Sequence, residues 1–181
     1  MLIGVIVACE IGFWLFLLAG LACRYLLKQQ RLSAVLLAMA PAVDLVLLVV
    51  SVIDLRGGGT ATTAHGLAAV YLGVSVGFGR RLLRWADVRF AHRFAGGAPP
   101  HPKPKYGAER AAHERSGWYA HLRAWLVGGA LLGLAIVAID DASRTRALLN
   151  TLQLWTLVLA IDAAISFSYT LFPKKLPASR A

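Results

Sequence analysis

Residues 33–55 read SAVLLAMAPAVDLVLLVVSVIDL, a run of 23 residues in which Asp44 and Asp54 carry the charge. An apolar α-helix of about 20 residues is long enough to cross a hydrocarbon core ~30 Å thick. The stretch therefore predicts a transmembrane helix, and it places the Asp44 carboxyl group near the middle of the bilayer.

Four more apolar stretches have a similar length, at residues 2–22, 61–79, 118–140 and 148–172. The chain is 58% hydrophobic and 15% charged and has a mean hydropathy of +0.63, whereas a soluble domain of 181 residues carries about 25% charged residues. The alternation of period two that marks β-strands is missing. We expect an all-α fold, a single bundle over residues 1–181 with five transmembrane helices.

Positive charge is distributed unevenly between the connections. Of the 19 Lys and Arg residues, three lie in residues 23–32, nine in 80–117 and three in 173–181, against one in 56–60 and two in 141–147. Lys and Arg collect in cytoplasmic loops. The pattern predicts an outside N-terminus, a cytoplasmic C-terminus and an odd number of crossings.

The long basic connection, residues 80–117, opens with a stretch that is amphipathic at helical spacing, residues 80–94. Such a helix would lie in the membrane interface, held by apolar burial and anionic lipid head groups. Gly96-Gly97 would end it, and the Pro-rich run 99–104 would continue as an extended segment. One reading of this connection is a topology anchor. The other is a surface for acidic lipids or a partner protein, made by Arg80, Arg81, Arg84, Arg89 and Arg93. No nucleic-acid-binding fold surrounds these arginines, so nucleic acid is not an expected partner.

Carboxyl groups near the middle of three apolar stretches are the main functional clue. Glu10, Asp44 and Asp162 fall within about 3 Å of one depth if each helix is straight and centred. A bare carboxylate in hydrocarbon is costly, so such groups face the bundle interior and are protonated, hydrogen-bonded or cation-bound. Hydrogen-bonding support is expected from Ser51, Ser166 and Tyr169. These acids could be packing glue, a proton or cation site, or a substrate site.

A second polar set lies near the predicted outer boundary and comprises Asp54, His65, Asp140 and Asp141. These residues could form an ion-paired vestibule with His65 as a titrating group. They could equally be helix caps and surface pairs, which helix ends normally carry.

Motifs for covalent or nucleotide chemistry are missing from the sequence: there is no nucleophile elbow, no phosphate loop and no paired Cys/His spacing. We therefore expect no cofactor, and the sequence favours a non-enzymatic role. Two Gly-x-x-x-Gly pairs, Gly73 with Gly77 and Gly129 with Gly133, predict close helix contacts. These contacts could join the third and fourth apolar stretches or build a homo-oligomer.

The run His65–Gly73, with Arg84-Trp85-Ala86-Asp87 after it, resembles small uncharacterised membrane proteins of high-GC Gram-positive bacteria. The resemblance implies a bacterial plasma membrane and carries no mechanism. We expect a membrane protein that binds or relays a proton or small cation, as a small transporter or channel does. The alternative is an accessory or assembly subunit of a larger membrane complex, docking through the basic connection and the glycine faces.

Overall fold

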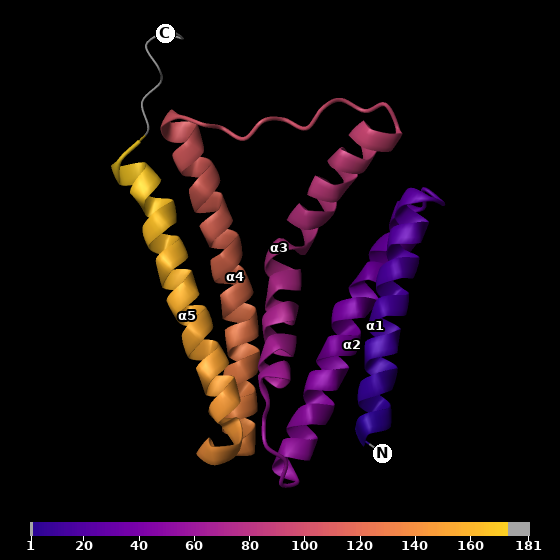
Figure 1. Cartoon of the computed structure of the whole chain (residues 1–181), viewed down its shortest axis with the longest axis vertical. Helices are drawn as coiled ribbons and strands as arrows, with labels where there is room; N and C mark the ends of the chain where they lie inside the picture. The colour runs from indigo at the N-terminus through magenta and orange to yellow at the C-terminus, as the bar shows by residue number, and fades with distance from the viewer. Residues whose placement is uncertain (1, 174–181) are drawn as a thin grey trace.

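A computed structural model describes residues 2–173, with side chains from Ala8 onward except that of Glu10. This part of the chain forms five helices: α1 (Leu2–Tyr25), α2 (Gln30–Arg56), α3 (Thr63–Phe94), α4 (Gly107–Ile139) and α5 (Ala142–Leu171). Consecutive helices run in opposite directions (Figure 1). No strand occurs between residues 2 and 173, so the predicted all-α class is confirmed.

Three of these helices are long and apolar enough to cross a membrane. They are α2 with 27 residues, α4 with 33 and α5 with 30. A shorter apolar helical stretch, Ile11–Tyr25, lies in α1. The three strongest predicted spans are thus helices as expected, and the crossing of the membrane by α1 and α3 stays a prediction.

The helices are arranged as two groups joined through α3 (Figure 1). Helix α1 packs along α2, and α4 packs along both α3 and α5. Helix α3 also contacts α2 and, less extensively, α5. As a result α2 and α5 lie on opposite sides of α3.

Connections meet at the two ends of the bundle (Figure 1). We call the end that holds the α1–α2 and α3–α4 connections, residues 26–29 and 95–106, the basic end. The far end holds the α2–α3 and α4–α5 connections, residues 57–62 and 140–141. The basic residues of the tail, Lys174, Lys175 and Arg180, lie outside the described residues.

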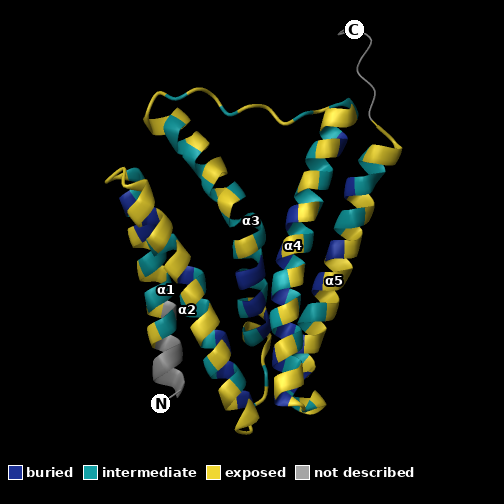
Figure 2. Cartoon of the chain, turned by 180° about the vertical axis from the view of Figure 1, so that it is seen from behind, coloured by how far each residue is buried: buried dark blue, intermediate teal, exposed yellow. Residues whose placement is uncertain are grey.

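Apolar side chains cover the outside of the bundle, as expected of helices that face lipid. Val46, Val137 and Leu157 are 54%, 75% and 57% exposed. Exposed residues run along the lengths of α2, α4 and α5 (Figure 2). The interior instead holds small or tightly packed residues, including Ala69 and Ala124 at 0% exposure. Small residues at the interface let helices approach closely where lipid removes the usual hydrophobic drive for association.

Helices α3 and α4 cross at a glycine contact. A Cβ atom on Gly73 would meet the carbonyl oxygen of Ala124 and lie 2.9 Å from the amide nitrogen of Gly128. A Cβ atom on Gly77 would lie 2.6 Å from the carbonyl oxygen of Ala120. The predicted packing of this glycine pair against the fourth stretch is confirmed, but its partner is Gly128 rather than the pair Gly129 and Gly133.

The predicted amphipathic helix of residues 80–94 is helical but is not a separate element. It continues without a break from the third apolar stretch, and both belong to α3. Figure 1 shows that α3 bends partway along its length, and its second half leans away from α4 toward the ends of α1 and α2. The reason is tertiary: Asp87 and Phe90 on this half bind Arg24 and Tyr25 at the end of α1.

The end of the amphipathic stretch and the extended run after it are as predicted, but the connection is shorter than residues 80–117 because α3 and α4 extend into it. Helix α3 stops at Phe94, Gly96 adopts a φ of 63° that favours glycine, and the Gly97 amide donates to the Ala91 carbonyl at 2.9 Å. The Pro-rich run has no regular structure, and α4 begins at Gly107 and continues into the fourth apolar stretch.

Candidate functional site

The two mid-depth aspartates that the structure describes lie in separate environments. Asp44 on α2 lines a pocket with residues of α1 and α3, whereas Asp162 on α5 contacts α4. The side chain of Glu10 lies outside the described residues. Equal depth did not bring Asp44 and Asp162 together, because depth fixes a residue's height along the bundle and α3 stands between their helices.

Asp162 forms the centre of a polar network between α4 and α5. Its Oδ2 atom lies 2.9 Å from Nδ1 of His121, and the indole Nε1 of Trp155 donates to Nε2 of His121 at 3.0 Å. Trp155 is 8% exposed, and the edge of its ring packs against the α3–α4 glycine contact at Gly73 and Gly128. The imidazole is therefore held from both sides by residues one helix away.

The two contacts define the tautomer of His121. An indole N–H can only donate, so Nε2 must accept and carries no proton. The proton of the neutral ring is therefore on Nδ1, which donates to the Asp162 carboxylate. A second proton at Nε2 would require Trp155 to release the ring.

The remaining predicted partners of Asp162 differ in their roles. Ser166 is buried, and its hydroxyl donates to Oδ1 of Asp162 over a long 3.4 Å. Tyr169 lies nearer the basic end, where the guanidinium of Arg110 stacks 4.3 Å from its ring centre. Ser166 therefore belongs to the Asp162 network, and Tyr169 is engaged by a cation instead.

His121 is the residue that the sequence analysis missed. Its position near the start of the fourth apolar stretch made it resemble a boundary residue. A signal for its pairing did exist: α4 and α5 are joined by the tight turn at Asp140 and Asp141, so residues equally far from the turn meet. His121 is 19 residues before Asp140, and Asp162 is 21 residues after Asp141.

Asp44 lies in a pocket of about 480 Å³ that α1, α2 and α3 form together. Its other lining residues are Phe13, Trp14, Leu47, Ala64, Leu67, Ala68 and Tyr71. No hydrogen bond or ion pair to Asp44 occurs among the side chains that the structure describes. The walls around the Asp44 carboxyl group are therefore mainly aromatic and aliphatic.

Ser51 does not join Asp44. Its hydroxyl donates to the carbonyl of Leu47 in its own helix at 2.7 Å, and it lines a different pocket with Thr62 and His65.

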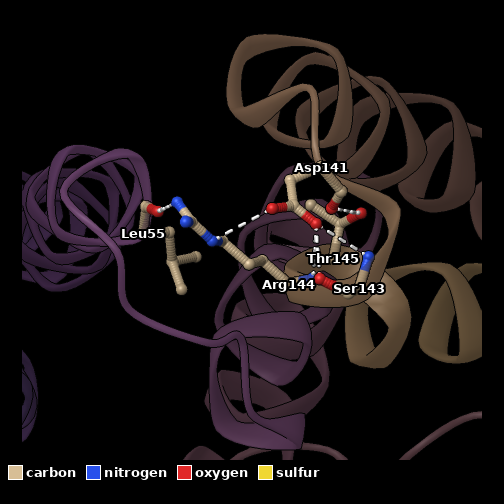
Figure 3. A network of polar contacts seen from close by, with 5 residues as sticks. All are labelled: Leu55, Asp141, Ser143, Arg144 and Thr145. Atoms are coloured by element: carbon tan, nitrogen blue, oxygen red, sulfur yellow. Dashed lines mark hydrogen bonds and ion pairs between the residues drawn. The ribbon is translucent and has the colours of Figure 1, made fainter.

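At the far end, Asp141 caps α5 (Figure 3). Its Oδ1 atom accepts from the amides of Ser143 and Arg144 at 2.9 and 3.2 Å, and Oδ2 pairs with Nε of Arg144 at 3.1 Å. Hydrogen bonds from Ser143 and Arg144 lower the pKa of the Asp141 carboxyl group. The guanidinium of Arg144 also reaches the Leu55 carbonyl at 3.4 Å, which links the end of α2 to the start of α5.

The other residues of the predicted vestibule are His65, Asp140 and Asp54, and they lie at helix ends. Nδ1 of His65 accepts from the backbone amide of Thr62 at 3.0 Å, which closes the first turn of α3. Asp140 ends α4 with a left-handed φ of 51°, and Asp54 is exposed near the end of α2. No group of three or more potential metal-binding side chains occurs within the described part of the chain. Capping therefore accounts for His65 and Asp141.

At the basic end, an ion pair joins α1 to α3. Nε of Arg24 donates to Oδ1 of Asp87 at 2.5 Å, the second guanidinium nitrogen binds Oδ2, and Tyr25 donates to Oδ1 at 3.3 Å. Both hydrogen bonding and charge from Arg24 lower the pKa of the Asp87 carboxyl group. Tyr25 also stacks on Phe90 with ring centres 4.2 Å apart.

An all-helical bundle with three long apolar helices and lipid-like exposure of aliphatic side chains defines an integral membrane protein. The chain is 42% identical over 174 residues to the uncharacterized membrane protein YmcC of Bacillus subtilis (strain 168). The aligned region covers 96% of this chain and 94% of the relative. The chain therefore belongs to the family of this membrane protein. No protein-family model matches the chain, and no solved structure matches it.

The similarity to YmcC tests one part of the predicted resemblance. Similarity to uncharacterised membrane proteins is confirmed, and membrane localisation with it. The high-GC Gram-positive source is not shown by this relative and stays a prediction.

Proposed function

We propose that this membrane protein handles protons through the His121–Asp162 pair between α4 and α5. The supporting observation is the 2.9 Å contact between Nδ1 of His121 and Oδ2 of Asp162, in two helices that are each apolar enough to span a membrane. Ionisable residues at membrane depth that pair with one another commonly serve proton relays. Histidine is the side chain that most readily changes charge near neutral pH.

The proposed protonation steps use only groups of this network, and release of the same protons reverses them. In the state described above, His121 is neutral and its Nδ1 proton faces Asp162. Uptake of a proton by Asp162 removes the negative charge, and uptake at Nε2 of His121 breaks the bond to Trp155. Because Trp155 packs on the α3–α4 crossing, the second event would loosen a helix contact. Proton binding and helix packing are coupled in this scheme.

Asp44 is a second proton or cation site in this proposal. It lies outside the His121–Asp162 network, and its pocket has no described cation or hydrogen-bond donor that pairs with it. We propose that Asp44 is protonated or takes a small cation in exchange for a proton. Glu10, on the neighbouring helix α1, stays a candidate for the same pocket.

The proposed topology has five crossings, with the basic end in the cytoplasm and the far end outside. Antiparallel packing of α1 along α2 and of α3 along α4 supports it, since each pair would cross together. The concentration of Arg and Lys in residues 23–32 and 80–117 supports the orientation. Single cysteines at Gly58 and His101, in a Cys9→Ser/Cys23→Ser background, should be labelled by an impermeant maleimide from the outside and the inside, respectively.

The accessory-subunit alternative relied on the basic connection and the glycine faces. Gly73 and Gly77 now have an internal partner in α4, so this face is not free to bind another protein. A Cβ atom on Gly133 would meet nothing within 4 Å, so this glycine is the one through which a second copy of the chain could still dock in this alternative. We rank the proton-handling proposal first, because it uses a network that already exists in the single chain.

A flux measurement tests the proposal. Purified protein in liposomes with an enclosed pH-sensitive dye receives an acid pulse, and the initial rate of internal acidification is compared among variants. Asp162→Asn should reduce the rate to that of empty liposomes. Asp140→Asn is the matched control, because it removes the same charge at an exposed helix end and should keep the wild-type rate. An unchanged rate in both Asp162→Asn and Asp44→Asn would refute proton handling at these sites.

A further inference from the structure

A large pocket lies toward the basic end of the bundle. It has a volume of about 1050 Å³ and opens between α1, α3 and α4. Ligand pockets for small molecules are typically about 300–1,000 Å³, so this one has the size of a binding site. Its lining residues are Arg24, Ser75, Val76, Gly77, Arg80, Arg81, Leu83, Arg84, Ser116, Ala120 and Arg123.

Five of these residues are arginines, and none is acidic. Arg24 is 13% exposed and is neutralised by Asp87. The other four, from α3 and α4, make no hydrogen bond or ion pair within the described part of the chain. Like charges that converge on one hollow repel one another unless a counter-charge enters, and their combined field concentrates anions there.

The pocket is shaped by the helix contacts around it. Its inner wall includes Gly77 and Ala120, which belong to the close crossing of α3 and α4. Beyond that crossing the second half of α3 leans toward α1, as Figure 1 shows, and the ion pair of Arg24 with Asp87 holds it there. Arginines from α3 and α4 thus line a space that the helix arrangement keeps open.

The chemistry of the lining favours phosphate. Guanidinium groups present rigid forks of N–H donors that match phosphate oxygens in bidentate hydrogen bonds. Ser75 and Ser116 add two hydroxyl groups at the same wall. Four uncompensated cations call for more than one negative charge, which a phosphomonoester or a diphosphate supplies and a single carboxylate does not.

We propose that the pocket lined by Arg80, Arg81, Arg84 and Arg123 binds the phosphate of a ligand that carries two or more negative charges. A lipid with a phosphomonoester head and a soluble diphosphate share this chemistry. The inference is independent of proton handling, since none of the four arginines forms a hydrogen bond or ion pair with His121 or Asp162 in the described part of the chain.

The test is native mass spectrometry of the full-length protein in detergent, titrated separately with dioleoyl phosphatidic acid, dioleoyl phosphatidylcholine and inorganic pyrophosphate. The pocket variant is Arg80→Gln/Arg123→Gln. The matched control is Lys103→Gln/Lys105→Gln, which removes the same charge from the α3–α4 connection, outside the pocket. We expect saturable 1:1 binding to wild type that weakens about tenfold or more in the pocket variant, the effect of losing charged hydrogen bonds. The control should change it less than about twofold.

The arms of the experiment separate the two sources. Binding of both phosphatidic acid and pyrophosphate supports the pocket with a soluble ligand allowed, and binding of phosphatidic acid alone supports a lipid. Arg84→Gln, an exposed side chain on the same wall, should weaken binding in the same direction and guards against misfolding of the double variant. Equal weakening in the pocket and control variants, or no preference over phosphatidylcholine, would overturn the proposal.

Discussion

Replacement of Gly73 by alanine should separate α3 from α4 and disturb the site. The added Cβ would meet the Ala124 carbonyl and lie 2.9 Å from both the Gly128 amide nitrogen and Cη2 of Trp155. Ordinary contacts between such atoms are about 3.5–4.0 Å. Two of the three obstacles are backbone atoms, so the helices themselves must move.

The magnitude follows from two opposing terms. Overpacking of a tight contact costs about 1–3 kcal/mol, and a clash with backbone belongs at the upper end. Alanine is favoured over glycine in a helix by about 1 kcal/mol. We therefore expect Gly73→Ala to lower the free energy of unfolding by about 2 kcal/mol.

Gly133→Ala on α4 is the matched control, because nothing lies within 4 Å of its added Cβ. This variant gains the helix term without the clash, so it should be as stable as wild type or more stable by about 1 kcal/mol. Both variants are compared by SDS titration of detergent-solubilised protein, with helicity followed by circular dichroism. Equal stabilities for Gly73→Ala and Gly133→Ala would refute the close α3–α4 crossing.

Other predictions concern the helix ends and the indole. Asp87→Asn should remove a stabilisation that wild type has at neutral pH, because the pKa of the Asp87 carboxyl group is lowered in the folded protein. This stabilisation is fully present above the unfolded pKa of about 3.9 and is lost as the pH falls through the lower folded pKa. The unfolding temperatures of wild type and variant should therefore converge below about pH 4. At the α4–α5 turn, Asp141→Ala should lower the unfolding temperature by removing the N-terminal cap of α5. Asp140→Gly should instead stabilise the protein by about 1 kcal/mol, because glycine adopts the positive φ of this position without strain. A change of stability in the same direction for both variants would contradict the capping geometry. Trp155→Phe should leave Nε2 of His121 without its donor, and the histidine nitrogen spectrum should then show a mixture of tautomers.

Local signals in the sequence predicted the helices well. The apolar run of residues 33–55 lies within α2, and all but the last residue of the run 148–172 lies in α5. Helix α3 ends just before Gly96-Gly97. Length, apolarity and glycine conformation are properties of the chain itself, so they can be recognised in the sequence. The junction between 61–79 and 80–94 was predicted wrongly. No proline lies there and α3 continues through Gly77 and Gly79. The docking of Asp87 on Arg24 is a contact between residues 63 positions apart.

Of the candidate site, only the acidic residues were predicted from the sequence. Depth along a helix can be counted from the sequence, so Asp44 and Asp162 were recognised as intramembrane carboxyl groups. Which helices are neighbours cannot be counted in that way, and α3 turned out to separate α2 from α5. The pairing of Asp162 with His121 depends on the register of the α4–α5 hairpin, which the short turn at Asp140 and Asp141 could have provided.

The central claim is that His121 is a Nδ1–H tautomer bound to Asp162 inside the α4–α5 hairpin. Solid-state nitrogen NMR of histidine-labelled protein in lipid, with His121 assigned by His121→Asn, measures this directly. We predict a protonated Nδ1 and an unprotonated Nε2 at alkaline pH, with the Nδ1 resonance shifted by Asp162→Asn and unmoved by Asp140→Asn. A protonated Nε2 in the wild type, or a His121 signal indifferent to Asp162→Asn, would contradict the account.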